Sequence, residues 1–357
     1  MPNVLIAATQ YGQPWNEGEK NIARVLAQAL SERGWEFCVC SHPTRDAEVA
    51  ARHSASLSKL VAAMRFWALV ARTARQRRAS VIHLLSSVSS VLGLKCAVIK
   101  RLSGASLLLH VTGLARPVLG YRVLLRADRI VIGGSYLQPL FPGAVNLPPL
   151  TPHMNPHLDR DAAISRNGVA AHRILYLGAM EPERGVHTLI AALAALATEL
   201  ACPRFTATLA WNGQGTREYA RRIQKTIQAL GLEARVQWKG VVPDLAALYR
   251  EHDLVVIPRA ARQRMGFPLR LIEALSYGKP VVVSDLGEMP AIVVDGSGLV
   301  FPHGDVPRLA HTLRRLLSDP DLYRQCVSTA YETAQRYPPS RTVGRFLDLY
   351  QEVARAR

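Results

Sequence analysis

The chain has 357 residues, of which 49% are apolar and 20% charged. This length corresponds to about two domains, and this composition excludes a disordered or fibrous protein. Lysine and arginine number 44 against 27 aspartates and glutamates, a net charge of +17, so we expect anionic partners: nucleotides, phospholipid headgroups or nucleic acid. An unspecific solvated surface is the alternative interpretation of the charge.

Short apolar runs bounded by turn residues alternate with helical patterns along the chain. Runs of this kind, separated by helices, predict parallel sheets in an α/β architecture with two Rossmann-like halves. The predicted strands form two sets of five: 4–8, 36–40, 80–84, 106–111 and 129–132, followed by 173–178, 206–211, 235–239, 254–257 and 280–284.

A proline-rich stretch separates the two sets of strands. Six prolines fall between positions 139 and 156, where they disfavour both a helix and a central strand. We therefore predict a first domain over residues 1–150 and a second over 165–338. A last helical pattern at 341–357 follows a break with Ser340 as a plausible N-cap, and we expect this helix to pack back on the first domain.

The N-terminal segment lacks the basic start and long apolar core of a signal peptide, and it reads as a first strand. No run of about 18 apolar residues is free of charge. The five cysteines have no metal-ligand spacing, and we see no paired carboxylates or histidine cluster suited to a metal. We expect a cytoplasmic protein, soluble or peripheral at the inner face of a membrane, that needs no metal.

Residues 57–78 form an amphipathic helical pattern with a strongly basic end. Leu57, Leu60, Val61, Met64 and Trp67 recur at helical spacing. Such a helix can lie on an anionic membrane, near a lipid-linked acceptor. Packing of its apolar stripe on the sheet of the first domain is the alternative.

In the second half, several predicted strands end in glycine turns. The strand over 173–178 ends at Gly178 and is followed by Arg184 at the start of a helix, where a cation and helix-terminal N–H groups can meet a phosphate. Another strand runs into Gly213, where a ligand can approach the backbone closely. Trp238 and Gly240 end a third strand. Each could equally be an ordinary turn.

The most informative stretch runs from Gly266 to Pro280. A glycine turn enters a helix at about Leu269, whose first N–H groups can face an anion. Glu273 lies one turn further in, where its carboxylate can reach ribose hydroxyls. The alternative is a solvated glutamate beside basic residues. The arginines around this place are Arg262, Arg264 and Arg270.

These blocks resemble the nucleotide-binding domain of GT-B glycosyltransferases, most closely glycosyltransferase family 4 (group 1). Residues 173–330 carry the blocks in the family's order and spacing, ending with 295–305 and the helix that follows. The first half is similar at 16–37, the family's opening glycine loop and helix, and at 109–114.

The resemblance implies a retaining transfer of a sugar, a hexose, from a nucleotide-diphosphate donor to a glycan, lipid-linked or other glycoconjugate acceptor, without a metal. The donor binds in a cleft facing both domains, held by the C-terminal half, and the acceptor is held by the N-terminal half. A catalytically inactive nucleotide-sugar-binding or partner protein of the same fold is the alternative. We expect no nucleic acid, because no recognised motif for it is present.

Carried over by position, Glu273 binds the ribose and Arg184 is one cation of a diphosphate clamp. His110 is the candidate for the catalytic face, with His83 competing. Two positions depart from the family: Met265 replaces a glutamate that contacts the donor sugar, and Ala179 replaces the second clamp cation. Arg262, Arg264 and Arg270 are candidate replacements for that cation. The resemblance assigns further donor contacts to Gly18, Gly113, Gly213, Trp238, Gly240, Gly266, Phe267, Pro268 and Leu269.

Overall fold

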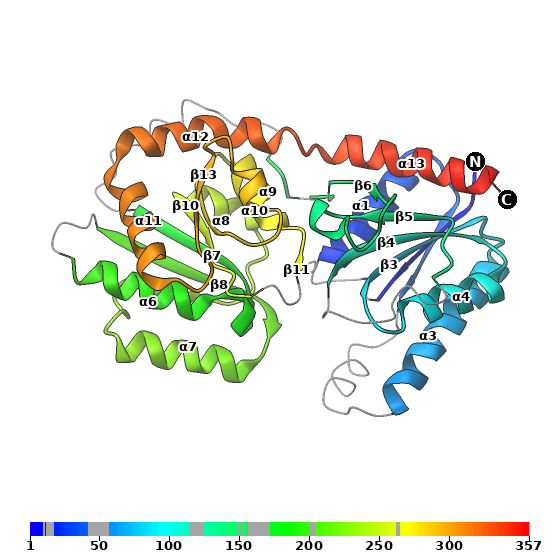
Figure 1. Cartoon of the computed structure of the whole chain (residues 1–357), viewed down its shortest axis with the longest axis horizontal. Helices are drawn as coiled ribbons and strands as arrows, with labels where there is room; N and C mark the ends of the chain where they lie inside the picture. The colour runs from blue at the N-terminus through cyan, green and yellow to red at the C-terminus, as the bar shows by residue number, and fades with distance from the viewer. Residues whose placement is uncertain are drawn as a thin grey trace. The chain divides into compact units, whose positions relative to one another are not determined.

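The structure is a computed structural model that describes residues 1–9, 11, 18–41, 57–114, 125–148, 150–151, 153–155, 172–199, 204–261 and 265–356. It divides into two compact units (Figure 1). Unit 1 comprises Met1–Pro152, Gln263–Phe267 and Pro339–Arg357, and unit 2 comprises His153–Arg262 and Pro268–Pro338. The second unit therefore begins before position 165, and a short internal segment, 263–267, belongs to the first.

Unit 1 contains a sheet whose strands β2, β1, β3, β4, β5 and β6 lie in that order and are all parallel. One further strand, β11, pairs antiparallel with β4. The strands are β1 (Val4–Ala8), β2 (Phe37–Ser41), β3 (Val81–Val88), β4 (Ser106–Leu114), β5 (Arg129–Ile132), β6 (Val145–Asn146) and β11 (Met265–Gly266), with a short 3-10 helix, η1, at Ser135–Leu137.

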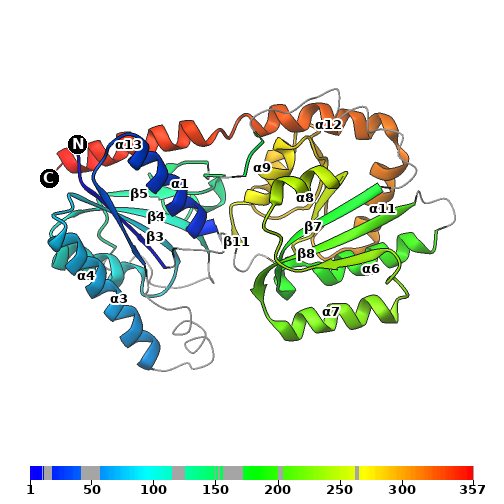
Figure 2. The same ribbon diagram turned by 180° about the vertical axis from the view of Figure 1, so that it is seen from behind.

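Helices cover both faces of this sheet (Figure 2). Alternate residues of β1 point to opposite faces, so Val4, Ile6 and Ala8 contribute to one apolar cluster and Leu5 and Ala7 to the other. The first cluster is closed by α1 (Gly18–Glu32) and α13 (Pro339–Arg355), and the second by α3 (Leu57–Gln76) and α4 (Leu92–Ser103).

The C-terminal helix α13 packs on the unit 1 sheet, although the chain reaches it from unit 2. Phe346, Leu349 and Tyr350 are fully buried in the cluster that contains α1. The helix begins at Pro339, because the fixed φ of proline suits the first helical position. Ser340 therefore lies inside the first turn, and the prediction that it is the N-cap is wrong.

Unit 2 contains a second parallel sheet, in the strand order β13, β12, β10, β7, β8 and β9. Its strands are β7 (His172–Met180), β8 (Phe205–Gly215), β9 (Val236–Lys239), β10 (Leu254–Ile257), β12 (Val281–Ser284) and β13 (Gly298–Phe301). Its helices are η2 (Pro182–Arg184), α6 (Val186–Ala197), α7 (Arg217–Ala229), α8 (Leu245–Glu251), α9 (Leu269–Ser276), α10 (Met289–Ile292), α11 (Val306–Ser318) and α12 (Pro320–Ala334).

The predicted α/β class with two Rossmann-like halves is confirmed, and each of the ten predicted strands is present within a few residues of its expected place. The strands β6 and β11 were not predicted because each has only two residues. The strand β13 was missed because it begins at Gly298. A Cβ there would lie 2.4 Å from the Val281 carbonyl oxygen, so only glycine allows β13 to pair this closely with β12.

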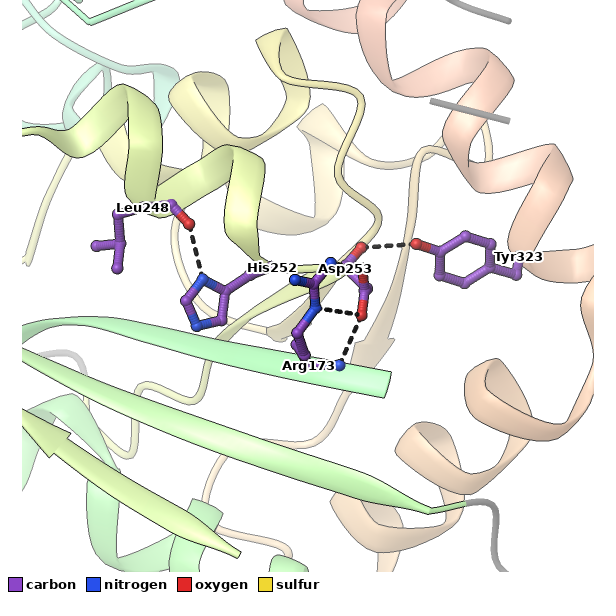
Figure 3. Close-up of polar contacts among 5 residues, drawn as sticks. All are labelled: Arg173, Leu248, His252, Asp253 and Tyr323. Atoms are coloured by element: carbon purple, nitrogen blue, oxygen red, sulfur yellow. Dashed lines mark hydrogen bonds and ion pairs between the residues drawn. The ribbon is translucent and has the colours of Figure 1, made fainter. Parts of the chain in front are cut away.

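An ion pair between the partly exposed Arg173 and the buried Asp253 joins the amino ends of β7 and β10 (Figure 3). The Asp253 carboxylate accepts hydrogen bonds from the backbone N–H of Arg173 at 2.7 Å and from its Nη2 at 3.1 Å. Tyr323 of α12 donates its hydroxyl to the Asp253 carbonyl at 2.8 Å. These contacts hold the two central strands in register, and they leave the opposite, carboxyl edge of the sheet available for ligands.

Two histidines lie buried between the unit 1 sheet and α13. His83 of β3 and His110 of β4 are 3.3 Å apart between Nε2 and Nδ1, and the hydroxyl of Tyr350 lies 2.6 Å from Nδ1 of His83. Both rings lie against Phe346. Burial lowers the pKa of His110 to about 3, and burial together with the neighbouring His110 lowers the pKa of His83 well below its ordinary value.

We predict that acid destabilises unit 1 through this pair. An unfolded histidine takes up a proton near pH 6.5, whereas these buried rings stay neutral, so the free energy of unfolding falls as the pH is lowered, by roughly 1.4 kcal/mol per pH unit for each histidine. Denaturant titrations between pH 7 and pH 5 should therefore give a shallower fall for His110→Phe than for the wild type. His311→Gln, at an exposed position, is the matched control. An unchanged slope in His110→Phe contradicts the prediction.

Candidate functional site

The glycine turns predicted from the sequence gather at the carboxyl edge of the unit 2 sheet, where ligands of open α/β sheets bind. After β7, the chain forms the turn Pro182–Arg184 and enters α6 at Gly185 with φ of 73°. A Cβ on Gly185 would lie 1.6 Å from the carbonyl oxygen of Pro258. The backbone N–H of Ala260 donates to the Glu183 carbonyl at 3.0 Å. Glycine thus allows this turn to press against the segment that follows β10.

Tyr176 forms a hydrogen bond with the segment that leads from β7 into this turn. Its hydroxyl donates to the carbonyl of Ala179 at 2.7 Å, and a Cβ on Gly178 would lie 2.8 Å from that hydroxyl. Burial raises the pKa of Tyr176 above its ordinary value, and the nearby guanidinium of Arg184 opposes that rise. The guanidinium of Arg184 therefore lies near the Tyr176 side chain. The Arg184 side chain is 36% exposed, and its Nε lies 3.8 Å from the Glu181 carboxylate.

The end of β8 lies directly beside the end of β7. Gly215 has φ of 93°, and a Cβ there would lie 2.1 Å from the Met180 carbonyl oxygen, to which Thr216 donates its backbone N–H at 3.1 Å. Gly213 also has a left-handed conformation, with φ of 83°. Both glycines are therefore required by the backbone, which accounts for the motif without a ligand.

Trp238 and Gly240 lie at the neighbouring edge strand. The indole ring of Trp238 meets Trp211 edge to face with centroids 6.3 Å apart. A Cβ on Gly240 would meet nothing within 4 Å. The space beside Gly240 and the half-buried indole of Trp238 agrees with the predicted place for a nucleobase. No contact in the described residues requires a glycine at position 240.

Glu273 of α9 is completely buried. Its Oε2 accepts hydrogen bonds from Nη1 of Arg270 at 2.6 Å and from the hydroxyl of Tyr249 at 3.0 Å. Its other oxygen, Oε1, is buried and has no hydrogen-bond partner among the residues that the structure describes. The interpretation of Glu273 as a solvated residue is therefore wrong. A buried carboxylate oxygen without a partner is costly, and its presence favours a ligand that donates to it.

Arg270 has a different place from the one predicted. Its guanidinium bonds to Glu273 and interacts with Tyr249 as well, so its charge is largely balanced within the core. The structure therefore places Arg270 as a positioning residue for Glu273, rather than as a replacement clamp cation. Arg262 and Arg264, the other candidate replacements, lie outside the described residues.

The predicted donor-sugar segment is divided between the two units. Met265 and Gly266 form β11 and pair with Leu114 and Gly113 of β4 in unit 1. A Cβ on Gly266 would lie 3.2 Å from the carbonyl oxygen of Thr112. Phe267 belongs to unit 1 as well, whereas Pro268 and Leu269 belong to unit 2, where Pro268 occupies the N-cap position of α9.

The predicted catalytic-face histidines do not lie at strand ends. The strands β3 and β4 extend to Val88 and Leu114, so His83 and His110 lie within them and are 0% and 3% exposed. The prediction that both histidines lie at strand ends is wrong. The strands β3 and β4 continue past the apolar runs, through polar residues that this pattern does not include. A side chain sealed beneath α13 has no route to a ligand without movement of that helix.

A polar network that the sequence did not predict lies at the carboxyl edge of the unit 1 sheet. Glu19, directly after Gly18 at the start of α1, accepts hydrogen bonds from Thr112 at 2.7 Å and from Thr9 at 3.2 Å. Lys95 of α4 donates to Ser86 at 2.9 Å. These residues come from five separate segments, so no local motif could have predicted the cluster.

Residues 171–319 match the family model for glycosyl transferases group 1, and the folds of solved GT-B glycosyltransferases match the whole chain. The chain has the GT-B fold, and residues 171–319 resemble the group 1 glycosyltransferases. The resemblance predicted from the sequence is thereby confirmed for both the family and the fold.

Among curated relatives of this chain, phosphatidyl-myo-inositol mannosyltransferase of Mycobacterium leprae is 31% identical over 51% of the chain and 46% of the relative. D-inositol 3-phosphate glycosyltransferase of Corynebacterium efficiens is 27% identical over 56% of the chain and 48% of the relative. The chain thus matches about half the length of each of these relatives.

Among solved structures, sucrose-phosphate synthase of Thermosynechococcus elongatus has a TM-score of 0.75 at 19% identity, with all of both chains covered. HepE of Anabaena in complex with UDP-glucose has a TM-score of 0.70 at 19% identity, covering 99% of this chain and all of that one. At this level of identity the likeness shows a common fold. No helix in the described part of the chain is long and apolar enough to cross a membrane.

We predict that removing the partner of Glu273 strongly destabilises unit 2. Arg270→Leu leaves a buried carboxylate uncompensated, which costs about 3–5 kcal/mol. Arg314→Leu is the matched control, because Arg314 pairs with Glu199 on the surface at 45% and 37% exposure and such pairs contribute at most about 1 kcal/mol. Urea denaturation of both variants checks this. Equal losses of stability would mean that the Glu273 pair is solvated.

Proposed function

We propose that this chain transfers a sugar, a hexose, from a nucleoside-diphosphate donor to a hydroxyl of a glycan, lipid-linked or other glycoconjugate acceptor, with retention of the anomeric configuration. The observation that carries the proposal is Glu273, whose Oε2 is held by Arg270 and Tyr249 while Oε1 is buried without a partner among the described residues. The names of the relatives support it, since one is a mannosyltransferase and another a glycosyltransferase.

The chemistry of a ribose suits this carboxylate. Its hydroxyls are hydrogen-bond donors, and a bond to an ionised acceptor is about twice as strong as a neutral one. The ion pair with Arg270 fixes the direction of the Glu273 carboxylate. Glu273 therefore binds the nucleoside and selects for a ribose without taking part in bond breaking.

The diphosphate is proposed to lie at the turn between β7 and α6, beside Arg184. In the reaction the bond between the donor C1 and the phosphate oxygen breaks, the acceptor oxygen bonds to C1 on the same face, and the acceptor proton passes to the leaving phosphate. Positive side chains stabilise the charge that develops on the diphosphate. In the described residues no group of three His, Cys, Asp or Glu side chains could hold a metal ion.

A nucleotide-sugar-binding protein without turnover is the second candidate. Met265 favours it, because a thioether cannot replace the carboxylate that the family uses at the donor sugar. Turnover distinguishes the two candidates: hydrolysis or transfer of a bound nucleotide sugar identifies an enzyme, whereas tight binding with no released nucleoside diphosphate identifies a binding protein.

We expect one nucleoside diphosphate among UDP, GDP, dTDP, ADP and CDP to raise the melting temperature, because a ligand that binds only the folded state stabilises it. Glu273→Gln should weaken that binding by about tenfold or more, since it removes a charge-assisted hydrogen bond. Glu218→Gln, at an exposed position of α7, is the control. If no nucleotide shifts the wild type, the donor proposal is wrong.

We also propose that unit 1 binds an anionic membrane surface through α3. One stripe of this helix packs on the sheet through Phe66, Trp67 and Val70. The opposite stripe exposes Val61 and Met64 at 41% and 51%. Exposed arginines accompany them at 65, 72 and 75, and the exposed Leu94 lies on α4, which packs beside α3. Apolar and cationic side chains on one surface are typical of interfacial helices.

Flotation with vesicles that contain phosphatidylglycerol tests this surface. The wild type should bind at low salt and dissociate at high salt, because the attraction is partly electrostatic. The double variant Met64→Ser, Leu69→Ser should bind several-fold more weakly, while Leu230→Ser, which removes an exposed leucine of unit 2, should bind as the wild type does. Absence of binding to anionic vesicles at low salt disproves the proposal.

A further inference from the structure

The carboxyl edge of the unit 1 sheet carries hydroxyl side chains from three adjacent strands. Thr9 directly follows β1, Ser86 lies near the end of β3, and Thr112 lies near the end of β4. The three strands lie side by side in the order β1, β3, β4. None of the roles proposed so far uses these hydroxyl groups, or the two charged residues that bond to them, Glu19 of α1 and Lys95 of α4.

This edge includes the point at which the strand order of the sheet reverses. The strand β2 pairs with one side of β1, and β3, the next strand along the chain, pairs with the other side. In open α/β sheets, ligands bind outside the carboxyl ends of the strands at such a reversal. The unit 2 sheet reverses in the same way between β7 and β10, beside the turn where the diphosphate is proposed to lie. Unit 1 thus has the topology of a ligand site of its own.

Hydroxyl groups hold Glu19 and Lys95 at this edge. The Glu19 carboxylate accepts a hydrogen bond from Thr112 at 2.7 Å and another from Thr9 at 3.2 Å. The Lys95 ammonium donates to the Ser86 hydroxyl at 2.9 Å, and that hydroxyl donates in turn to the backbone carbonyl of the next residue at 3.1 Å. These bonds fix the position of each charged group before a ligand binds.

The two charges interact without direct contact. Burial lowers the pKa of Lys95 below its ordinary value, and the Glu19 carboxylate opposes that fall. Within the described part of the chain the two groups nevertheless form no ion pair with each other. Glu19 and Lys95 are both half-buried, so a ligand can reach them. A ligand group that bonds to both would complete a contact that the protein leaves open.

The hydrogen-bonding capacity left on these two groups indicates which ligand fits. A carboxylate accepts about four hydrogen bonds and donates none, whereas an ammonium has three N–H donors and accepts none. Among the residues that the structure describes, Glu19 accepts two hydrogen bonds and Lys95 donates one. A sugar hydroxyl both donates and accepts, so it can use the capacity of both. An ionised phosphate or carboxylate only accepts, and it would meet the like charge of Glu19.

We propose that Glu19 and Lys95 together bind an uncharged polyhydroxyl ring, a sugar or polyol, through two of its adjacent hydroxyl groups, and that this ring is the acceptor. The inference rests on the proposed function, because it names the class of acceptor for that transfer. Thr9 and Thr112 are positioning residues for Glu19, and Ser86 is the positioning residue for Lys95. The site selects against acceptors that carry a phosphate or carboxylate on this ring.

Saturation-transfer NMR on the full chain tests the site with the methyl glycosides of glucose, mannose, galactose and N-acetylglucosamine. At least one should bind, and more tightly than its 6-phosphate or the corresponding uronic acid. Glu19→Gln and Lys95→Met should each weaken that binding about tenfold or more, since each removes a charge-assisted hydrogen bond. Glu32→Gln, at an exposed position of the same helix as Glu19, is the control and should bind as the wild type does.

The role of Glu19 and Lys95 is overturned if no uncharged sugar binds, if the 6-phosphate binds more tightly, or if both variants bind as the control does. Where the variants do not fold, hydrogen exchange of the wild type decides: the sugar should slow exchange in peptides covering 18–22 and 84–96, and absence of slowing there overturns the role as well. Thermal shift with nucleoside diphosphates separates the two proposals. A wild type that binds no nucleotide refutes the proposed function, whereas one that binds a nucleotide and no sugar refutes only this acceptor site.

Discussion

A carboxylate removed from water must have partners, and in unit 2 the carboxylate of Glu273 has them on one oxygen only. Arg270 and Tyr249 hold Oε2, whereas Oε1 is buried without a partner in the described part of the chain. This half-satisfied group imposes a cost on the folded protein that a ligand hydroxyl can remove. Arg270 of α9 and Tyr249 of α8 are the side chains that meet this constraint.

The arginines at this edge of the sheet differ in how deeply they are buried and in which residues they pair with. Arg270 forms an ion pair with Glu273, and Arg184 is partly exposed beside Glu181. Arg259, which follows β10, is buried. The net charge of +17 says nothing about these differences.

Unit 1 is assembled from distant parts of the chain. Its sheet accepts β11 from a segment that lies between two stretches of unit 2, and α13 closes one face over His83 and His110. Pairing of Gly266 with Gly113 brings two predicted donor contacts into one sheet. The neutral histidines beneath α13 make the closure of that face sensitive to acid, since a protonated imidazole cannot remain in this apolar setting.

The sequence by itself determined the α/β class, the ten strands, the resemblance to group 1 glycosyltransferases and the place of Glu273 on α9. These follow from local signals: apolar runs, glycine turns, and motif blocks in a fixed order. It did not determine the location of His110 inside β4, the partner of Arg270 or the N-terminus of α13. Each of those depends on contacts between residues far apart in the chain. Register between neighbouring strands, helix packing and burial decided them, because these set which charges are shielded from water and which side chains meet.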